Sequence, residues 1–359
     1  MTRTVSISLD QFYRPQPGGI ATYVRGLVGG LVALHDDAFR LVGVAPRGQP
    51  TQDVSDLALE RVIAPASIKV LTRAWARWPL GVPSFSDVVH ATSLAGPFAG
   101  GGSGAVHCVA LHDLLWRDEP STSTPRGVRF HERRLQMLQR RDDVRLFTTA
   151  PGLAQRLIGE GFAPSRLHEV RLGVDDATSA DSEGQVRAFL AEHGVHGPYT
   201  LYAGTREPRK NLDRLLDAHA QAVATNRELG PLVLVGPQGW GEVDSGDAVV
   251  LGLVARSLLR GLYRDATVVA YVPRAEGWGL PPVEALHEGT RVVASATTPS
   301  AMNNDEVVIV DPLDVSDIAA GLLRALSQSN DELARGRRRA SVATLTWRNV
   351  ALDHLAGWQ

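Results

Sequence analysis

The sequence predicts an α/β fold made of two halves, each a parallel sheet with helices on both faces. Short β-branched runs alternate with longer helical patterns along the whole chain, which is typical of βαβ units. The chain has 359 residues, more than the roughly 150 of one ordinary domain, so two domains are expected. No short internal repeat competes with this interpretation.

In the first half, β-branched runs of strand length predict five strands. They are expected at residues 4–9, 40–44, 88–90, 106–111 and 145–149. Apolar residues at helical spacing predict helices at residues 20–34 and 128–139.

Residues 68–78 predict a further, amphipathic helix. It would place three apolar side chains on one face and three cations on the other: Leu71, Trp75 and Trp78 against Lys69, Arg73 and Arg77. Two interpretations stay open for this helix. It lies on a membrane surface, or it packs on its own sheet, which is the commoner case.

The second half repeats the rhythm of the first. Strands are expected at residues 199–203, 232–235, 266–271 and 291–294, with helices at 211–224, 255–264 and 281–287. Residues 175–185, between the halves, are polar, small and charged, which is linker composition. We therefore expect residues 1–180 and 181–345 to form separate domains.

Composition narrows the function classes. The 44% of hydrophobic and 21% of charged residues exclude a disordered chain, and the net charge of -2 gives no bulk attraction to nucleic acid. The single cysteine, Cys108, cannot form an intrachain disulfide, which fits a reducing compartment. No secretory signal is visible, and no apolar run approaches the roughly 20 residues of a spanning helix. We expect a cytoplasmic protein.

Three glycine-containing turns between a strand and a helix are candidates for holding phosphate, because free amides at a helix N-terminus attract anions. The first is Pro17-Gly18-Gly19-Ile20, which either binds an anion or only closes a βα loop. It is not a dinucleotide fingerprint, since G-x-G-x-x-G is missing. The second, residues 204–211 (GTREPRKN), carries three cations that either face an anion or are solvated.

The third turn, residues 276–284 (EGWGLPPVE), is the most informative. Its two prolines stand at a helix start, where no N–H is needed, and the glycines before them leave amides free. Glu276 falls in the loop and Glu284 about one turn into the helix, so both carboxylates can address one molecule. Carboxylates accept hydrogen bonds from paired hydroxyls, so the segment predicts recognition of a sugar or ribose diol.

Together these segments resemble a retaining glycosyltransferase of the GT-B fold, the group 1 or family 4 enzymes, whose E-x7-E signature corresponds to Glu276 and Glu284. The resemblance covers essentially the whole chain and also includes residues 17–20, 88–91, 111–114, 172–175, 204–211, 235–241 and 311–314. It implies two Rossmann-like domains facing across a deep cleft, with the acceptor on the first and the nucleotide sugar on the second. A last helix, residues 346–359, would cross back to the N-terminal domain.

The resemblance also implies roles for single residues. Glu284 would bind ribose hydroxyls, Glu276 sugar hydroxyls, and His112 would line the sugar pocket. Lys210 would neutralise the diphosphate together with Arg206 or Arg209, because Thr205 stands where many members carry arginine. The candidate catalytic residues are therefore Glu276, Lys210, Arg209 and His112. The candidate donor-binding residues are Gly18, Gly19, Thr205, Arg206, Gly277, Trp278, Gly279, Leu280 and Glu284.

The implied mechanism is a same-face displacement in which the departing phosphate helps to deprotonate the acceptor, with Glu276 as a sugar ligand rather than a nucleophile. No Asp-x-Asp motif occurs in the sequence, so we expect cationic side chains instead of a metal ion, and no cofactor. The sequence of residues 204–211 is similar to that of family members that transfer mannose or related hexoses. It favours a GDP-sugar, with a UDP-sugar as the alternative.

The acceptor is the least specified part: a glycan, a lipid-linked sugar or a small molecule. Residues 126–145 carry seven arginines against three acidic residues. Three interpretations stay open for this basic segment: it binds a lipid-linked diphosphate, it contacts membrane headgroups, or it is only solvated, which is the default. Together with residues 68–78, this basic segment would allow a peripheral contact of the N-terminal domain with the inner face of a membrane. The competing activities are a nucleotide-sugar epimerase, a sugar phosphorylase and a degenerate, non-catalytic partner protein.

Overall fold

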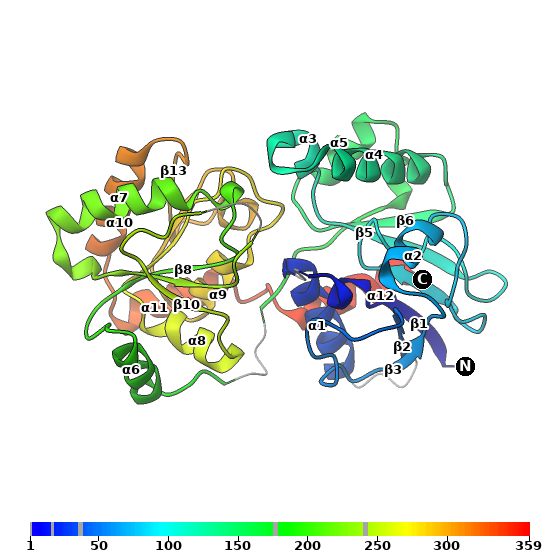
Figure 1. Ribbon diagram of the computed structural model, residues 1–359, viewed down its shortest axis with the longest axis horizontal. Helices are drawn as coiled ribbons and strands as arrows, with labels where there is room; N and C mark the ends of the chain where they lie inside the picture. Colours follow the sequence, from blue (N-terminus) through cyan, green and yellow to red (C-terminus); the bar gives the residue numbers. More distant parts are fainter. Residues whose placement is uncertain (1, 16–17, 35–38, 175–178, 240–242) are drawn as a thin grey trace. The chain divides into compact units, whose positions relative to one another are not determined.

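The computed structural model describes residues 2–15, 18–34, 39–174, 179–239 and 243–359, so Pro17, residues 175–178 of the expected linker and Trp240-Gly241 lie outside the described residues. The chain forms two compact units (Figure 1). The first comprises Met1–Gly173 and Thr346–Gln359, and the second is Val174–Leu345. The second unit is thus an insertion in the first, and it begins before the boundary expected near residue 180.

The first unit contains a seven-stranded parallel sheet, ordered β3-β2-β1-β4-β5-β6-β7. Its strands are β1 Arg3–Ser8, β2 Phe39–Ala45, β3 Glu60–Ile63, β4 Val88–Ala91, β5 Val106–Leu111, β6 Val144–Thr148 and β7 Leu167–Glu169. Its helices are α1 Gly18–Ala33, α2 Ile68–Ala74, α3 Leu115–Asp118, α4 Pro125–Gln139, α5 Leu153–Gly159 and α12 Trp347–Trp358. The central strand β4 is buried along its whole length and β5 over its last four residues, because both faces of the sheet are covered.

The second unit contains a six-stranded parallel sheet, ordered β10-β9-β8-β11-β12-β13. The strands are β8 Thr200–Ala203, β9 Leu232–Val235, β10 Val249–Gly252, β11 Val268–Tyr271, β12 Val292–Ser295 and β13 Val307–Val310. One core cluster joins the sheet to α6 Glu183–Glu192, α8 Arg256–Asp265 and α9 Leu280–His287. The other joins it to α7 Leu212–Thr225 and α10 Val315–Ser327, so helices cover both faces (Figure 1). Helix α11, Glu332–Ser341, follows α10.

The strand order reverses once in each sheet, between β1 and β4 and between β8 and β11. At such a switch point the loops leaving two neighbouring strands turn in opposite directions, which opens a crevice at their carboxyl ends where ligands bind. The two Rossmann-like sheets confirm the expected α/β class, and each has one such point.

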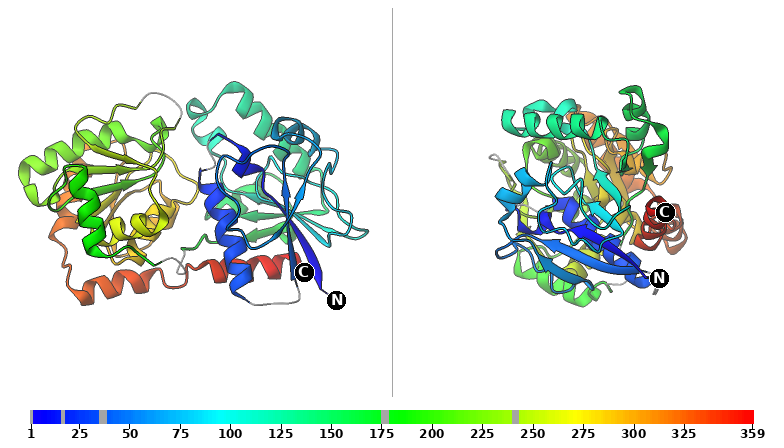
Figure 2. Two further views of the ribbon diagram at one scale, coloured as in Figure 1. Left: turned by 60° about the horizontal axis from the view of Figure 1, so that its bottom comes forward. Right: turned by 90° about the vertical axis from the view of Figure 1, so that its right-hand side faces the viewer.

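Helix α12 packs on α1, and two glycines of α1 make the approach close (Figure 2). A Cβ atom at Gly26 would lie 2.0 Å from the Trp347 ring, and one at Gly30 would lie 2.1 Å from the Trp347 carbonyl oxygen. Gly173, where the chain leaves the first unit, similarly lies against Thr346, where it returns. The expected return of the last helix to the N-terminal domain is therefore confirmed.

The amphipathic segment 68–78 forms a shorter helix than expected, α2, which ends at Ala74. Leu71 and Trp75 join a core cluster with Val44 and Ala64, so this face packs on its own sheet. Trp78 was expected on the same face, but it lies beyond the helix and is 65% exposed. Among the described helices, none combines the length and the apolar character needed to cross a membrane.

Candidate active site

A largely buried group of charged side chains lies at the switch point of the second unit. The turn after β8 carries Lys210, and the loop after β11 carries Glu276. Because β8 and β11 are neighbouring parallel strands, the two loops leave the same edge of the sheet. Asn211 fixes the first loop: it adopts a left-handed conformation, φ 62°, and its side-chain amide donates to the carbonyls of Val272 and Pro312.

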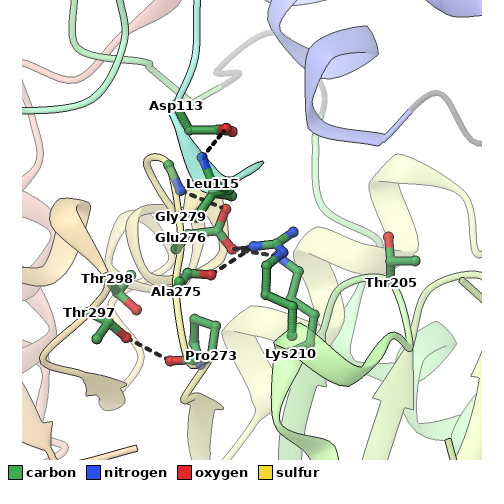
Figure 3. A network of polar contacts seen from close by, with 12 residues as sticks. Asp113, Leu115, Thr205, Lys210, Pro273, Ala275, Glu276, Gly279, Thr297 and Thr298 are labelled. Carbon is green, nitrogen blue, oxygen red and sulfur yellow. Dashed lines mark hydrogen bonds and ion pairs between the residues drawn. The ribbon is translucent and has the colours of Figure 1, made fainter. Parts of the chain in front are cut away.

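Three hydrogen-bond donors converge on one oxygen of Glu276, and Figure 3 shows Lys210 beside this carboxylate. Lys210 Nζ donates to Glu276 Oε2, Tyr271 Oη donates to the same atom at 2.6 Å, and Arg209 Nη1 approaches it at 3.2 Å. Lys210 Nζ also donates to Tyr271 Oη at 2.6 Å. The other carboxylate oxygen, Oε1, accepts from the Gly277 amide at 3.2 Å.

This network keeps Glu276 ionised. Burial opposes ionisation, but the charges of Lys210 and Arg209 and the hydrogen bonds from Lys210 and Tyr271 outweigh it and hold the pKa of Glu276 well below its ordinary value. Burial also lowers the pKa of Lys210, which the charge of Glu276 counteracts. Only 13% of the Glu276 side chain and 10% of the Lys210 side chain is exposed, so each charge depends on the other.

The two candidate phosphate arginines differ in their surroundings. Arg209 donates to the Ala275 carbonyl at 2.8 Å and to Glu207 at 2.7 Å, in addition to Glu276, so it belongs to the network. Arg206 instead donates weakly to Ser245 Oγ at 3.4 Å, and its backbone bridges to Gln238. Thr205 lies away from the Lys210–Glu276 pair (Figure 3).

The loop that precedes α9 is tightly packed. Gly279 adopts φ 89°, and a Cβ atom there would lie 2.5 Å from Thr298 Cγ2, so only glycine fits. The Ser300 amide donates to the Trp278 carbonyl at 2.9 Å, and Leu280 is the first residue of α9. Trp278 is buried, and its indole nitrogen has no hydrogen-bond partner in the structure.

Glu284 lies on α9 but has a separate set of partners. Its Oε1 accepts from Arg256 at 2.9 Å and its Oε2 accepts from the Tyr263 hydroxyl at 2.9 Å. It lines a small cavity with Val174, Arg256, Leu259, Arg260, Tyr263, His287 and Glu288, and Glu276 is not among these residues. The structure therefore gives the two signature glutamates different neighbours, although the sequence suggested that they address one molecule.

In the first unit, Gly18 and Gly19 begin α1 after the switch-point strand β1, and a Cβ atom at either would meet no atom within 4 Å. His112 directly follows β5. Its Nε2 bonds to the Thr92 carbonyl at 2.9 Å, so this nitrogen donates, and its Nδ1 pairs with Thr149 Oγ1 at 3.1 Å. Burial lowers the pKa of His112. His112 is therefore a neutral imidazole at the carboxyl edge of the sheet.

Sequence reasoning missed three residues that complete these groups. Tyr271 is the last residue of β11, and Arg256 and Tyr263 lie on α8. Tyr271 stands five positions before Glu276 at a strand end, which is a usable signal, whereas Arg256 and Tyr263 meet Glu284 only through the packing of α8 on α9. Within the described residues, no group of three histidine, cysteine or acidic side chains is arranged to hold a metal ion.

Residues 197–328, which contain the Lys210–Glu276 network and Glu284, match the family of glycosyl transferases group 1. This match lies within the second unit and spans a little over a third of the chain. The chain is 35% identical over 173 residues to the O-antigen chain mannosyltransferase B of Escherichia coli, which covers 45% of each chain. It is also 30% identical over 230 residues to the MMP alpha-(1->4)-mannosyltransferase of Mycolicibacterium hassiacum, 60% of this chain and 53% of that one.

The chain resembles solved structures along nearly its full length. Sucrose-phosphate synthase from Thermosynechococcus elongatus superposes with a TM-score of 0.73 at 17% identity, covering 99% of this chain and 98% of the other. Anabaena HepE, solved with UDP and glucose, gives a TM-score of 0.68 at 14% identity over 99% and 98%. These likenesses confirm the expected GT-B fold. The sequence matches to the curated relatives span only about half of their length.

Proposed function

We propose that this protein is a retaining glycosyltransferase that moves a hexose from a nucleoside diphosphate sugar to an acceptor hydroxyl. The observation that carries the proposal is the Lys210–Glu276 pair, held at the switch point of the segment that matches the group 1 glycosyl transferases. A cation and an ionised carboxylate in contact can bind the two parts of a sugar nucleotide, its phosphates and its hydroxyls.

Lys210 has the geometry for a diphosphate ligand. Its ammonium group has three N–H donors, of which the hydrogen bonds to Tyr271 and Glu276 use two. We assign the third to a phosphate oxygen of the donor. Arg209 adds a second positive charge on the same carboxylate, and the pair would stabilise the negative charge that develops on the leaving phosphate without a metal ion.

Glu276 fits a sugar ligand better than a nucleophile. Three donors already converge on its Oε2, and its lowered pKa reflects a strongly stabilised anion, which is a weak nucleophile. We therefore propose a same-face displacement. The anomeric C–O bond to phosphate breaks, the acceptor oxygen forms the new bond, and its proton goes to the departing phosphate.

The remaining assignments follow the same reasoning. Glu284, which accepts from Arg256 and Tyr263, would bind the ribose, and the loop Gly277–Leu280 would surround the sugar. Gly18, Gly19 and the neutral His112 would contribute from the first unit. Mannose is the favoured sugar because both named curated relatives are mannosyltransferases, and a GDP-sugar is the first donor to test. A UDP-sugar is the second, because HepE was solved with UDP.

A panel of nucleotides and sugar nucleotides tests the proposal in the presence of EDTA. A ligand at a hundred times its Kd should stabilise the fold by about 2.7 kcal/mol, which is a measurable rise in Tm. The stabilising sugar nucleotide should then support transfer to hexose acceptors. If no nucleotide raises Tm, the proposal is wrong, and stabilisation without transfer or hydrolysis identifies a non-catalytic binding protein.

The Lys210→Ala variant tests the site itself. Transfer should fall about 10²- to 10³-fold because the leaving phosphate loses a preorganised cation. Affinity for the nucleoside diphosphate should fall, while affinity for the nucleoside alone should hardly change. Circular dichroism controls for folding. Near-normal turnover excludes the phosphate role, and a covalent sugar trapped on Glu276 excludes the same-face mechanism.

A further inference from the structure

The indole nitrogen of Trp278 is a buried hydrogen-bond donor that has no partner among the described residues. The residue is only 7% exposed, and its Nε1 is shielded from solvent. A buried tryptophan N–H ordinarily has an acceptor, because an unpaired buried donor costs the free energy of its desolvation. Two buried tryptophans of the first unit follow this rule. Trp75 donates to the Leu80 carbonyl at 2.9 Å, and Trp116 donates to Glu132 Oε1 at 2.6 Å.

Other buried polar atoms without a partner in the described part of the chain are easier to accommodate. A hydroxyl turns to suit its surroundings, a neutral imidazole can carry its proton on the other nitrogen, and a guanidinium has four further N–H donors. These three cases cover Thr148 Oγ1, Nε2 of His168 and His219, and Nε of Arg206, Arg291 and Arg338. An indole has a single donor in a fixed direction. The unpaired N–H of Trp278 therefore indicates a partner that is not part of the described chain.

Trp278 lies in the middle of the loop that connects the Lys210–Glu276 network to α9. Glu276 stands two positions before it, and α9 begins two positions after it. Ser300 fixes the backbone here: its amide donates to the Trp278 carbonyl at 2.9 Å, and its hydroxyl donates to the Gly279 carbonyl. Both chain neighbours of Trp278 are glycines, so the indole can turn on this fixed backbone without displacing an adjacent side chain.

The free side of the Glu276 carboxylate faces the same loop. Oε2 accepts from three donors, whereas Oε1 accepts, within the described residues, only from the Gly277 amide at 3.2 Å. A Cβ atom at Gly279 would lie 3.5 Å from Glu276 Cγ, so the loop folds back on the carboxylate and keeps Trp278 beside it. Oε1 is thus the oxygen with room for a further hydrogen bond, and Trp278 is the unused donor next to it.

A hydroxyl group matches this combination of an acceptor and a donor. It donates its single proton to one partner and still has lone pairs that accept from another. A carboxylate satisfies only the first of these two roles, because it carries no proton. A sugar hydroxyl bound to Glu276 Oε1 would therefore remain half satisfied until an N–H group donates to its oxygen.

We propose that the Trp278 indole N–H donates to the sugar hydroxyl that Glu276 accepts from, and that Trp278 thereby determines which hexose is bound. The inference rests on the proposed function. The ring turns toward the sugar when the sugar nucleotide binds. The role belongs to the side chain and is separate from that of the backbone amides of the loop. A hexose that lacks this hydroxyl is rejected because both Glu276 and Trp278 then lose their partner.

Calorimetric titration of the full chain with a sugar nucleotide and with its nucleoside diphosphate tests the contact. Trp278→Phe should weaken binding of GDP-mannose about 5- to 10-fold and leave binding of GDP within about twofold, because only the sugar loses a hydrogen bond. UDP-glucose and UDP replace this pair if the uridine nucleotides are the ones that stabilise the wild type. Trp75→Phe is the matched control and should change neither affinity. Unchanged binding of the sugar nucleotide by Trp278→Phe overturns the inference, and so does equal weakening of both ligands.

Monodeoxy analogues of the sugar nucleotide identify the hydroxyl. For the wild type, removal of one particular hydroxyl should weaken binding at least about tenfold. In Trp278→Phe the penalty for the same analogue should be about fivefold smaller, because that variant has already lost the hydrogen bond. A penalty that stays the same at every ring position would show that Trp278 contacts no sugar hydroxyl.

The indole N–H resonance of Trp278 provides a direct readout in the wild type. It is assigned by its disappearance in Trp278→Phe, and it should move downfield with GDP-mannose but hardly with GDP. In the free protein, Trp278→Phe should lower Tm less than Trp75→Phe, because only the second variant breaks a hydrogen bond and leaves the Leu80 carbonyl without its donor. An indole resonance that the sugar nucleotide does not move, or equal losses of Tm, would contradict the proposal.

The same measurements separate this inference from the proposed function. If no sugar nucleotide stabilises the wild type, the proposed function is wrong and the inference is wrong with it. If the wild type binds and transfers the hexose while Trp278→Phe binds the sugar nucleotide equally well, only the role of Trp278 is wrong.

Discussion

At the scale of single residues, the loop after β8 separates two arginines that the sequence could not rank. Arg209 reaches the Glu276 carboxylate, whereas Arg206, three positions earlier, reaches Ser245. The difference arises from the turn at residues 208–210, which directs the two side chains to different partners. Only the spatial arrangement decides which cation accompanies Lys210.

Substitution of the two arginines should therefore have unequal effects. Arg209→Ala should lower kcat/KM for the sugar nucleotide about 10- to 100-fold, because a charge next to the reacting phosphate is lost. Arg206→Ala should lower it less than about threefold. Steady-state kinetics on the two purified variants measures this, and an equal loss in both would assign Arg206 to the site as well.

At the scale of elements, α12 completes the first unit through a buried chain of hydrogen bonds. Trp358 Nε1 donates to His90 Nδ1 at 3.3 Å, so neutral His90 carries its proton on Nε2 and donates to Tyr23 Oη at 2.8 Å. Tyr23 then donates to His354 Nε2 at 2.7 Å, and His354 Nδ1 donates to the Val350 carbonyl. Each ring nitrogen of His90 and His354 either donates or accepts one hydrogen bond, so an added proton would find no acceptor in this series of hydrogen bonds.

This series of hydrogen bonds should make the stability of the first unit depend on pH. Burial lowers the pKa of His354 to about 4, with the nearby His112 and His168 acting in the same direction. The unfolded state, with a histidine pKa of about 6.5, then binds more protons, so stability is complete above pH 6.5 and falls by about 3 kcal/mol as the pH drops to 4.

Urea unfolding at pH 7 and pH 5, followed by tryptophan fluorescence, measures this loss. His354→Gln should reduce the pH dependence, whereas the control His193→Gln, at an exposed histidine, should not. Wild-type stability that is flat between pH 7 and pH 5 would contradict a neutral His354.

The contact of α12 with α1 depends on glycine at particular positions. Gly26→Ala should destabilise the protein by about 1 to 3 kcal/mol or more, because its Cβ would overlap the Trp347 ring. Gly29→Ala is the matched control on the same helix, where no atom lies within 4 Å, and it should be neutral or stabilising by up to about 1 kcal/mol. Chemical denaturation compares the two. Equal losses would show that helix conformation, not the fit to α12, determines the cost.

At the scale of the whole molecule, the second unit has its own sheet, its own core clusters and the whole Lys210–Glu276 network. Residues 174–345 should therefore fold when expressed alone and bind the nucleoside diphosphate without transferring sugar. Calorimetric binding and a cooperative thermal transition check this. A fragment that stays unfolded would show that the first unit is required for its stability.

Much of this arrangement could be predicted from the sequence. Uniform apolar runs such as residues 232–235 and 268–271 identified the central strands, and the segments 204–211 and 276–284 identified the loops of the site. All four edge strands, β3, β7, β10 and β13, were missed. For β3 and β7 the reason is that ERVI and LHE are short and at least half polar. The partners of Glu284 were missed because Arg256 and Tyr263 reach it from another helix, a contact that spacing along the chain does not encode.

The two points where the chain passes between the units have a consequence for how this protein can vary. Gly173 lies against Thr346, and the Val174 amide donates to the Leu345 carbonyl at 2.9 Å, so the inserted unit begins and ends at one place. A segment whose two ends lie side by side can be replaced by another segment of the same kind. If it is removed altogether, a short link between residues 173 and 346 is enough to close the first unit. Recombination at these two junctions would exchange the second unit while α1 and α12 keep their packing.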